Sequence, residues 1–178
     1  SDADGNPMWD YPDNVTFDPG TLIAAGDVFV IAHGSANDAI LAEADANFTY
    51  LSNGDDAFAL TLAGTTADDM SGIVDIIGDL SLTDPGAGWA VAGVADATQN
   101  HTLVRKPGMV SGNMGNWPMS AGTDAETSEW VVLDLVLDED GAQTGDWSGV
   151  GSHSNEAVVL CDFTEVTLNI ADSYGDGW

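Results

Sequence analysis

The sequence is almost without fixed positive charge. Its 178 residues include 2 Lys and Arg against 30 Asp and Glu, which gives a formal net charge of −28 at pH 7. A field this negative repels phosphate backbones and anionic lipids, so we expect neither nucleic acid nor membrane insertion among its interactions. Self-repulsion also destabilises the compact state unless cations screen it, which predicts a setting rich in salt or divalent cations.

Cysteine and long apolar runs are scarce as well. Cys161 is the only cysteine, so no disulfide can form within the chain, and its neighbours "VVLCDF" favour a buried position in a strand. No stretch is long and apolar enough to span a membrane, and no signal peptide precedes "SDADGNP". We therefore expect a mature or excised piece of an extracellular, secreted or cell-surface protein.

Apolar residues are plentiful, however, and they predict a folded chain. Hydrophobic residues make up 44% of it, with 6 Trp and 5 Phe, unlike disordered acidic segments. One helix is expected at 36–46, capped by Asn37 or Asp38. Short β-branched runs bounded by turn residues predict strands at 27–32, 57–62, 73–77, 130–136 and 165–170. Together these indicate an all-β fold, an antiparallel sandwich or barrel with one short helix.

The order of several segments resembles that of a known family. These segments are "LIAAGDVFVIAHGSANDAILAEAD" (22–45), "NGDDAFALTLAG" (53–64), "IVDIIGD" (73–79), "GWAVAGVADATQNHTLVRKPGMVSGN" (88–113), "NW" (116–117) and "EWVV" (129–132). In this order they resemble the lamin tail domain of bacterial and algal secreted proteins, over roughly residues 15–153. The resemblance implies an immunoglobulin-like antiparallel β-sandwich without an active site of its own.

Two departures from that family bear on domain organisation. Nothing in residues 1–20 matches the strand pair with which the family opens, and "VTLNIADSYGDGW" (166–178) resembles the start of a different secreted β-module. We therefore expect a lamin-tail-like sandwich at 1–153 and a linker with the first strand of a second module at 154–178. Missing strands leave a sheet edge open, which another subunit, or an upstream or downstream module of the same polypeptide, can fill.

The only two Lys and Arg residues are adjacent, in "NHTLVRKP". In one interpretation Arg105 forks onto carboxylates or carbonyls at a strand end and pins a turn, while Lys106 is a solvated neighbour. In the other, the pair recognises an anionic ligand. The net charge favours the structural interpretation, because free anions are repelled and internal carboxylates are abundant.

No catalytic motif stands out. The histidines, His33, His101 and His153, have no metal-site spacing and no nucleophile beside them, so we expect no enzyme. Calcium, the expected structural cofactor, binds oxygen donors on Gly-rich loops such as "DADGN", "DEDG" and "DSYGDG", although these could equally be ordinary solvated turns. The candidate calcium ligands are Asp2, Asp4, Asn6, Asp138, Asp140, Asp172 and Asp176.

Asparagine sequons and aromatic residues offer further candidate sites. Asn14, Asn47 and Asn100 begin N-x-S/T sequons, which are glycosylated only in a eukaryotic secretory protein. Trp9 and Tyr11 could form a sugar-binding platform. By the family resemblance, the core is expected to include Trp89, Trp117 and Trp130.

These observations predict a non-catalytic, calcium-stabilised extracellular domain with a structural or adhesive role in a surface layer, filament or adhesin. Two alternatives stay open. The chain could be an accessory domain of a secreted enzyme such as a nuclease, or it could be a glycan-binding module.

Overall fold

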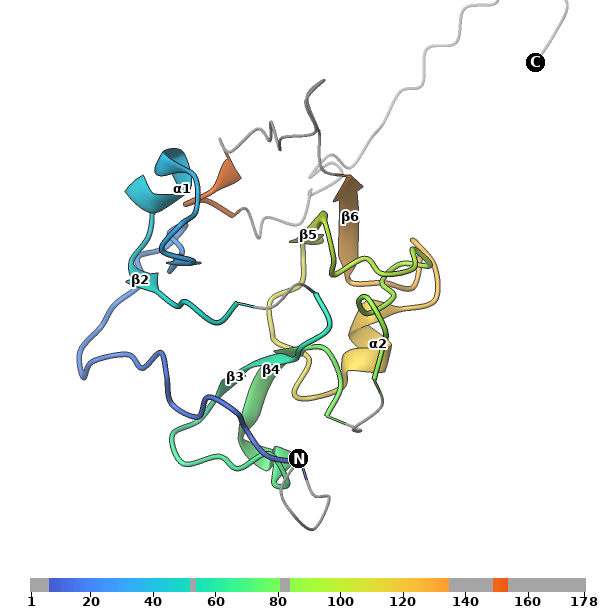
Figure 1. The fold of residues 1–178 in the computed structure, drawn as a ribbon, viewed down its shortest axis with the longest axis horizontal. Helices are drawn as coiled ribbons and strands as arrows, with labels where there is room; N and C mark the ends of the chain where they lie inside the picture. Colours follow the sequence, from blue (N-terminus) through green and yellow to red (C-terminus); the bar gives the residue numbers. More distant parts are fainter. Residues whose placement is uncertain (1–6, 52–53, 81–83, 135–148, 154–178) are drawn as a thin grey trace, which may run out of the picture.

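The computed structural model of the chain describes residues 7–51, 54–80, 84–134 and 149–153. Short strands dominate it, with two α-helices and one 3₁₀ turn (Figure 1). The elements are β1 (Ile31–Ala32), α1 (Asp38–Ala42), β2 (Ala46–Asn47), β3 (Phe58–Thr61), η1 (Met70–Gly72), β4 (Ile73–Ile77), β5 (His101–Arg105), α2 (Trp117–Ala121) and β6 (Trp130–Asp134). The fold is therefore small and β-rich with few short helices.

The described strands form three sheets of two strands each. β3 and β4 are antiparallel with a register shift at Leu60/Thr61, and β5 and β6 are antiparallel with Arg105 opposite Trp130. β1 and β2 are parallel, so the expectation of purely antiparallel pairing is wrong for this pair. Parallel neighbours need a crossover, and α1 lies in the one between them.

The helices differ from the prediction in number and length. The predicted helix at 36–46 is reduced to α1, whose N-cap is Asn37: its side chain accepts a hydrogen bond from the Ala39 N–H at 2.9 Å. It ends early because the next residues turn back toward Val30, the residue before β1. The N–H groups of Asp45 and Ala46 both donate to the Val30 carbonyl. The expectation of a single helix is also wrong, because α2 forms a second.

The strand predictions agree best in the middle of the chain. Residues 57–62 and 73–77 contain β3 and β4, and 130–136 begins with β6, while the strand predicted at 27–32 shortens to β1. β2 has no counterpart among the predicted strands. The strand predicted at 165–170, Cys161 and the proposed second module lie beyond the described residues.

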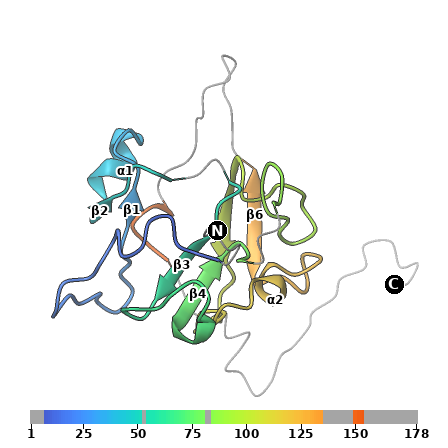
Figure 2. The same cartoon turned by 60° about the horizontal axis from the view of Figure 1, so that its bottom comes forward.

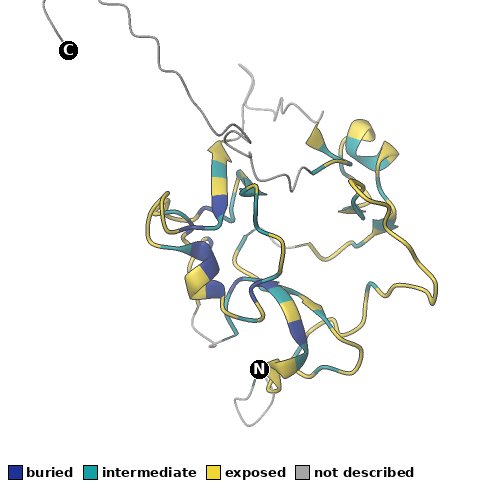
Figure 3. Cartoon of the chain, turned by 180° about the vertical axis from the view of Figure 1, so that it is seen from behind, coloured by how far each residue is buried: buried dark blue, intermediate teal, exposed yellow. Residues whose placement is uncertain are grey.

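A single buried cluster holds β4, β6 and α2 together (Figure 3). Trp117 and Trp130 pack with ring centroids 6.5 Å apart, and both are buried as predicted. Trp89 is partly buried against the same cluster. The cluster consists of Ile73, Ile76, Val91, Ala97, Trp117, Ala121 and Trp130.

The segment containing β1, α1 and β2 lies on the opposite side of the molecule from α2 and β6 (Figure 2). Of the described residues 7–51, Ala32 alone is buried. The helices described here are all too short to cross a membrane.

Candidate functional site

Arg105 ends β5 and reaches three other parts of the fold. Its Nη1 donates to Asp75 on β4, and its Nη2 donates to Glu129 Oε2 at 2.5 Å and to Ser120 Oγ at 3.2 Å. The guanidinium carbon lies 4.7 Å from the centroid of the Trp130 ring. The Arg105 side chain is only 13% exposed, so these contacts form largely away from water, where charged hydrogen bonds are strong.

Ser120 on α2 connects this network to the core. Its hydroxyl donates to Glu129 Oε2 at 2.6 Å and accepts from Trp130 Nε1 at 2.9 Å and from Arg105 Nη2. A hydroxyl has one donor and two acceptor positions, so the hydrogen-bonding capacity of this fully buried residue is complete. A backbone bond from the Glu129 N–H to the Ser120 carbonyl fixes the same two segments together.

Asp75 connects the network to the loop before α2. Its Oδ1 accepts from the Asn113 N–H at 2.9 Å. The buried Asn113 amide then bonds both backbone groups of Ile76, donating to the carbonyl at 2.7 Å and accepting from the N–H at 3.1 Å. The Met114 N–H donates to the Val74 carbonyl at 3.1 Å. Residues 113–114 thus occupy the side of β4 away from β3, as a neighbouring strand would.

The charges in this network stabilise one another. Burial disfavours the charged form of Arg105, but its bonds to Glu129 and Asp75 outweigh that cost and raise the pKa of the guanidinium. Burial likewise disfavours the ionised Glu129, but the Ser120 hydroxyl and Arg105 lower the pKa of its carboxyl. The Arg105 Nε is buried and has no hydrogen-bond partner within the described ranges. One cation is therefore held between two carboxylates.

Lys106 is also bound within the fold. Its Nζ donates to the Ala125 carbonyl at 2.6 Å and to the Ser128 carbonyl at 2.5 Å. Its N–H donates to the Glu129 carbonyl at 2.8 Å, which brings the 125–128 turn over the side chain. The expectation of a solvated neighbour is wrong, because this turn presents its carbonyls to the ammonium. Both side-chain cations of the sequence are thus engaged internally.

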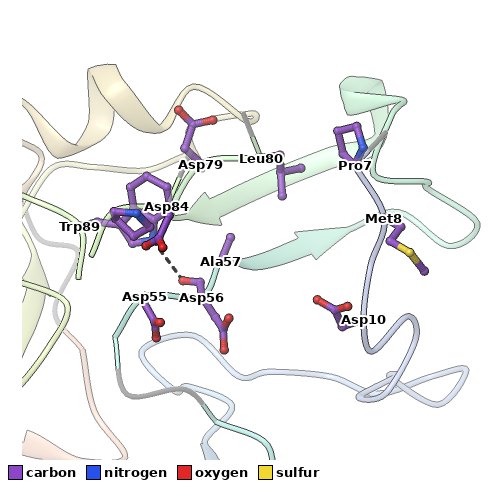
Figure 4. A pocket seen from close by; sticks show the side chains of 11 residues that line it. Pro7, Met8, Asp10, Asp55, Asp56, Ala57, Asp79, Leu80, Asp84 and Trp89 are labelled. Carbon is purple, nitrogen blue, oxygen red and sulfur yellow. Dashed lines mark hydrogen bonds between the residues drawn. The ribbon is translucent and has the colours of Figure 1, made fainter. Parts of the chain in front are cut away.

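A separate pocket of about 320 Å³ lies where β3 begins (Figure 4). Met8, Leu80 and Trp89 give it an apolar wall, and the Trp89 indole N–H donates to the Asp56 carbonyl at 3.2 Å. Five carboxylates line it: Asp10, Asp55, Asp56, Asp79 and Asp84. Because they come from separate segments of the chain, no single stretch of the sequence indicates that they meet.

The seven predicted calcium ligands, in the segments 2–6, 138–140 and 172–176, lie outside the residues that the structure describes. Within residues 7–51, 54–80, 84–134 and 149–153, no group of three or more His, Cys, Asp or Glu is arranged to hold a metal ion, and the pocket aspartates are no exception.

The histidines and the sequon residues are the remaining candidates, and His101 among them begins β5. His33 Nδ1 accepts from the Ser35 N–H at 3.0 Å, and His101 Nε2 lies 3.6 Å from Asp134 Oδ1. The three sequon residues are exposed: Asn14, Asn47 and Asn100.

The aromatic pair Trp9 and Tyr11 does not act as one surface. The Trp9 indole N–H donates to the Thr65 carbonyl at 3.2 Å and its ring packs against the core. Tyr11 stacks instead on Tyr50, with centroids 4.7 Å apart and an angle of 8° between the rings.

Comparisons with protein-family models, curated proteins and solved structures found no match for this chain. The resemblance to lamin tail domains therefore rests on the segments quoted above.

Proposed function

We propose that this chain is a non-catalytic structural or adhesive domain that works outside the cell, assembles with other polypeptides and is stabilised by calcium. The observation that carries the proposal is the incomplete burial of its apolar residues. Leu22, Leu62, Val110 and Met114 are 90%, 63%, 83% and 77% exposed. Leu62 directly follows β3 and continues the exposed row of Phe58 and Leu60, and an exposed apolar row on a strand is typical of a surface that a partner covers.

The use of the two cations supports a structural role for "NHTLVRKP". An anion-recognition site needs cations that are free to meet a ligand. Arg105 and Lys106 instead bind protein carboxylates and carbonyls. No other Lys or Arg exists in the sequence. The chain is thus poorly equipped for an anionic substrate, which favours assembly over ligand processing.

The net negative charge of the chain supports the proposed stabilisation by calcium. At −28 the chain gains from any cation that neutralises its carboxylates, and calcium binding to the folded state alone adds stability by mass action. The proposed ligands are those of the acidic segments at 2–6, 138–140 and 172–176.

An immunoglobulin-like sandwich of the lamin tail type is the architecture we propose for the complete domain. The order of the segments that resemble the family supports it, and the antiparallel pairs β3–β4 and β5–β6 would provide four of its strands. Strands from another polypeptide or module would complete the sheets.

Glycan binding is a second candidate, favoured by the stacked rings of Tyr11 and Tyr50, which are 49% and 60% exposed. Titration with soluble oligosaccharides while tyrosine and tryptophan fluorescence is recorded tests it. A saturable signal that Tyr50→Ser removes would support this function, and an unchanged signal would exclude it.

Calorimetry of the full chain tests the main proposal. A self-sufficient two-state domain of this length has an unfolding enthalpy of roughly 120 kcal/mol near 60 °C. We expect a value well below this in sodium chloride, and a clearly higher melting temperature in millimolar calcium at the same ionic strength. A monomer with the full enthalpy in sodium, and no additional shift with calcium, would contradict the proposal.

A further inference from the structure

We propose that the edge of β3 that pairs with no described strand accepts an extended strand from a different polypeptide, and that a lysine or arginine of this strand enters the acidic pocket at the start of β3. This inference rests on the proposed assembly function and names the acceptor edge and the chemistry of the partner.

The β3–β4 sheet can grow in only one direction. Among the described residues, β3 pairs with β4 and with no other strand. The far side of β4 is occupied by Asn113 and Met114. An edge strand presents backbone N–H and C=O groups at strand spacing, and an added strand satisfies them. The backbone of β3 therefore specifies the conformation of its partner.

The side chains of β3 specify an apolar partner. Phe58, Leu60 and Leu62 alternate along the chain and are 39%, 50% and 63% exposed, while Ala59 packs against the core. Native edge strands are usually protected by charge, proline or a covering segment. The sequence of residues 57–62, "AFALTL", has no charge and no proline. An added strand with alternating apolar side chains would cover the three exposed residues.

The acidic pocket favours a positively charged side chain on the partner strand. Ala57, the residue before β3, is one of the lining residues (Figure 4), so a strand that pairs with β3 and extends past its start would come close to the pocket. A lysine or arginine stem can lie on Met8, Leu80 and Trp89 while its charge reaches the surrounding aspartates. A volume of about 320 Å³ is large enough for one such side chain.

The same charge argument excludes a second copy of this chain as the occupant. Its only Lys and Arg, Arg105 and Lys106, are bound within the fold. Two chains of charge −28 also repel each other. The occupant is therefore a different polypeptide with basic residues beside an apolar strand.

A peptide titration against the full chain tests this inference. The probe is a blocked nine-residue peptide that alternates valine and threonine between two terminal lysines. One control peptide has glutamate in place of both lysines, and the other has N-methylated backbone amides at alternate positions. Affinity is measured by calorimetry, and hydrogen exchange reports which amides become protected.

We expect the lysine peptide to bind at least tenfold more tightly than either control and to protect amides within residues 58–62. The double variant Leu60→Ser/Leu62→Ser should weaken binding at least tenfold, whereas Leu22→Ser, at another exposed leucine, should not. Asp10→Asn with Asp55→Asn should abolish the preference for lysine over glutamate. The matched pair Asp18→Asn with Asp38→Asn, which removes the same charge elsewhere, should preserve it.

Three results would overturn the inference: no binding of the lysine peptide, equal affinity for the lysine and glutamate peptides, or binding without protection of β3. None of them alters the calorimetric test of the proposed function, which uses the chain without peptide. Conversely, full cooperative unfolding of the chain alone would remove the proposed assembly function while peptide binding at β3 could still be observed.

Discussion

Residues 73–134 and residues 7–51 differ in how far they bury their apolar side chains. Both are acidic segments rich in turns. The first buries two tryptophans and several aliphatic side chains in one cluster. Apart from Trp9, whose ring packs against that cluster, the second gathers its aromatic rings in exposed or half-exposed groups, such as Phe17 with Phe29 at 4.9 Å, and it buries Ala32 alone among its described residues. Similar composition thus yields a core in one region and surface pairs in the other.

The distribution of cations explains much of this difference. Residues 73–134 hold Arg105 and Lys106, which bind groups 15–30 residues away along the chain. Residues 7–51 contain no Lys or Arg. Their carboxylates accept backbone N–H groups instead, as Asp27 does from the adjacent Val28 and Asp45 from Val30, 15 residues away. Charged bonds between side chains thus join the segments of residues 73–134 over a core, whereas the described part of residues 7–51 is shaped by bonds from single carboxylates to the backbone.

Removal of the Arg105 guanidinium should lower the stability of the chain most. Arg105→Met should destabilise the chain by about 3–5 kcal/mol, because Asp75 and Glu129 would face each other without a counter-charge. Arg105→Lys keeps the charge but loses the fork, and should cost roughly 1–3 kcal/mol. Urea unfolding followed by tryptophan fluorescence measures both changes.

Lys106→Met is the neighbouring control for Arg105. It removes two bonds to turn carbonyls and no carboxylate partner, so it should cost only about 1 kcal/mol. Equal losses at the two positions would mean that the carboxylate pairing of Arg105 has no special weight.

The next largest loss of stability is expected from a change that disturbs the contact between β4 and the loop at 112–114. A Cβ at Gly112 would collide with the Val74 carbonyl. Gly112→Ala should therefore cost about 1–3 kcal/mol through overpacking. Gly34→Ala, where nothing lies within 4 Å of the added atom, should change stability by less than about 0.5 kcal/mol. The same urea assay applies, and indistinguishable midpoints for the two variants would argue against a close approach at Gly112.

Acid should weaken the Arg105 network in a defined pH window. The pKa of Glu129 is lower in the folded chain than its ordinary value of 4.5, so its contribution is complete above pH 4.5 and is lost as the pH falls through the lowered pKa. Glu129→Gln should be less stable than the parent by about 1.5 kcal/mol at pH 7. This gap should close on acidification. Thermal unfolding of both proteins between pH 7 and pH 3 measures it, and a gap that stays constant would contradict the role of the carboxylate charge.

The smallest effect is expected in residues 7–51. Phe17 is 45% exposed and meets one other ring, so Phe17→Ala should cost no more than about 1 kcal/mol. Urea midpoints of this variant and of Trp130→Ala, expected to lose about 3–5 kcal/mol, give the comparison directly. A loss at Phe17 as large as that at Trp130 would show a second core.

Local signals predicted part of this fold. β4 was predictable because residues 73–77 form a β-branched run between Gly72 and Gly78. The short helix α2 was missed, although Asn116 at its N-cap, Pro118 in its first turn and Gly122 at its end were signals that could have found it. Five residues are too few for a helical periodicity to be visible.

The candidate sites were less accessible to sequence reasoning. A fork at Arg105 was foreseeable, but its partners Asp75 and Glu129 are 30 and 24 residues distant among 30 carboxylates. The acidic pocket draws its aspartates from separate segments, so no single motif encodes it. The parallel pairing of β1 with β2 depends on backbone bonds around Val30, which leave no pattern in the side chains.

Hydrogen exchange of the full chain without partners tests the central claim most directly, because it reports the stability of each region separately. We expect the amides that pair β5 with β6, and those of α2 that bond within the core, to exchange at least about a hundredfold more slowly than the amides around β1, α1 and β2. Uniform protection across residues 27–48 and 101–134 would contradict the account, since it would require one cooperative core in place of an Arg105-centred core beside a loosely packed segment.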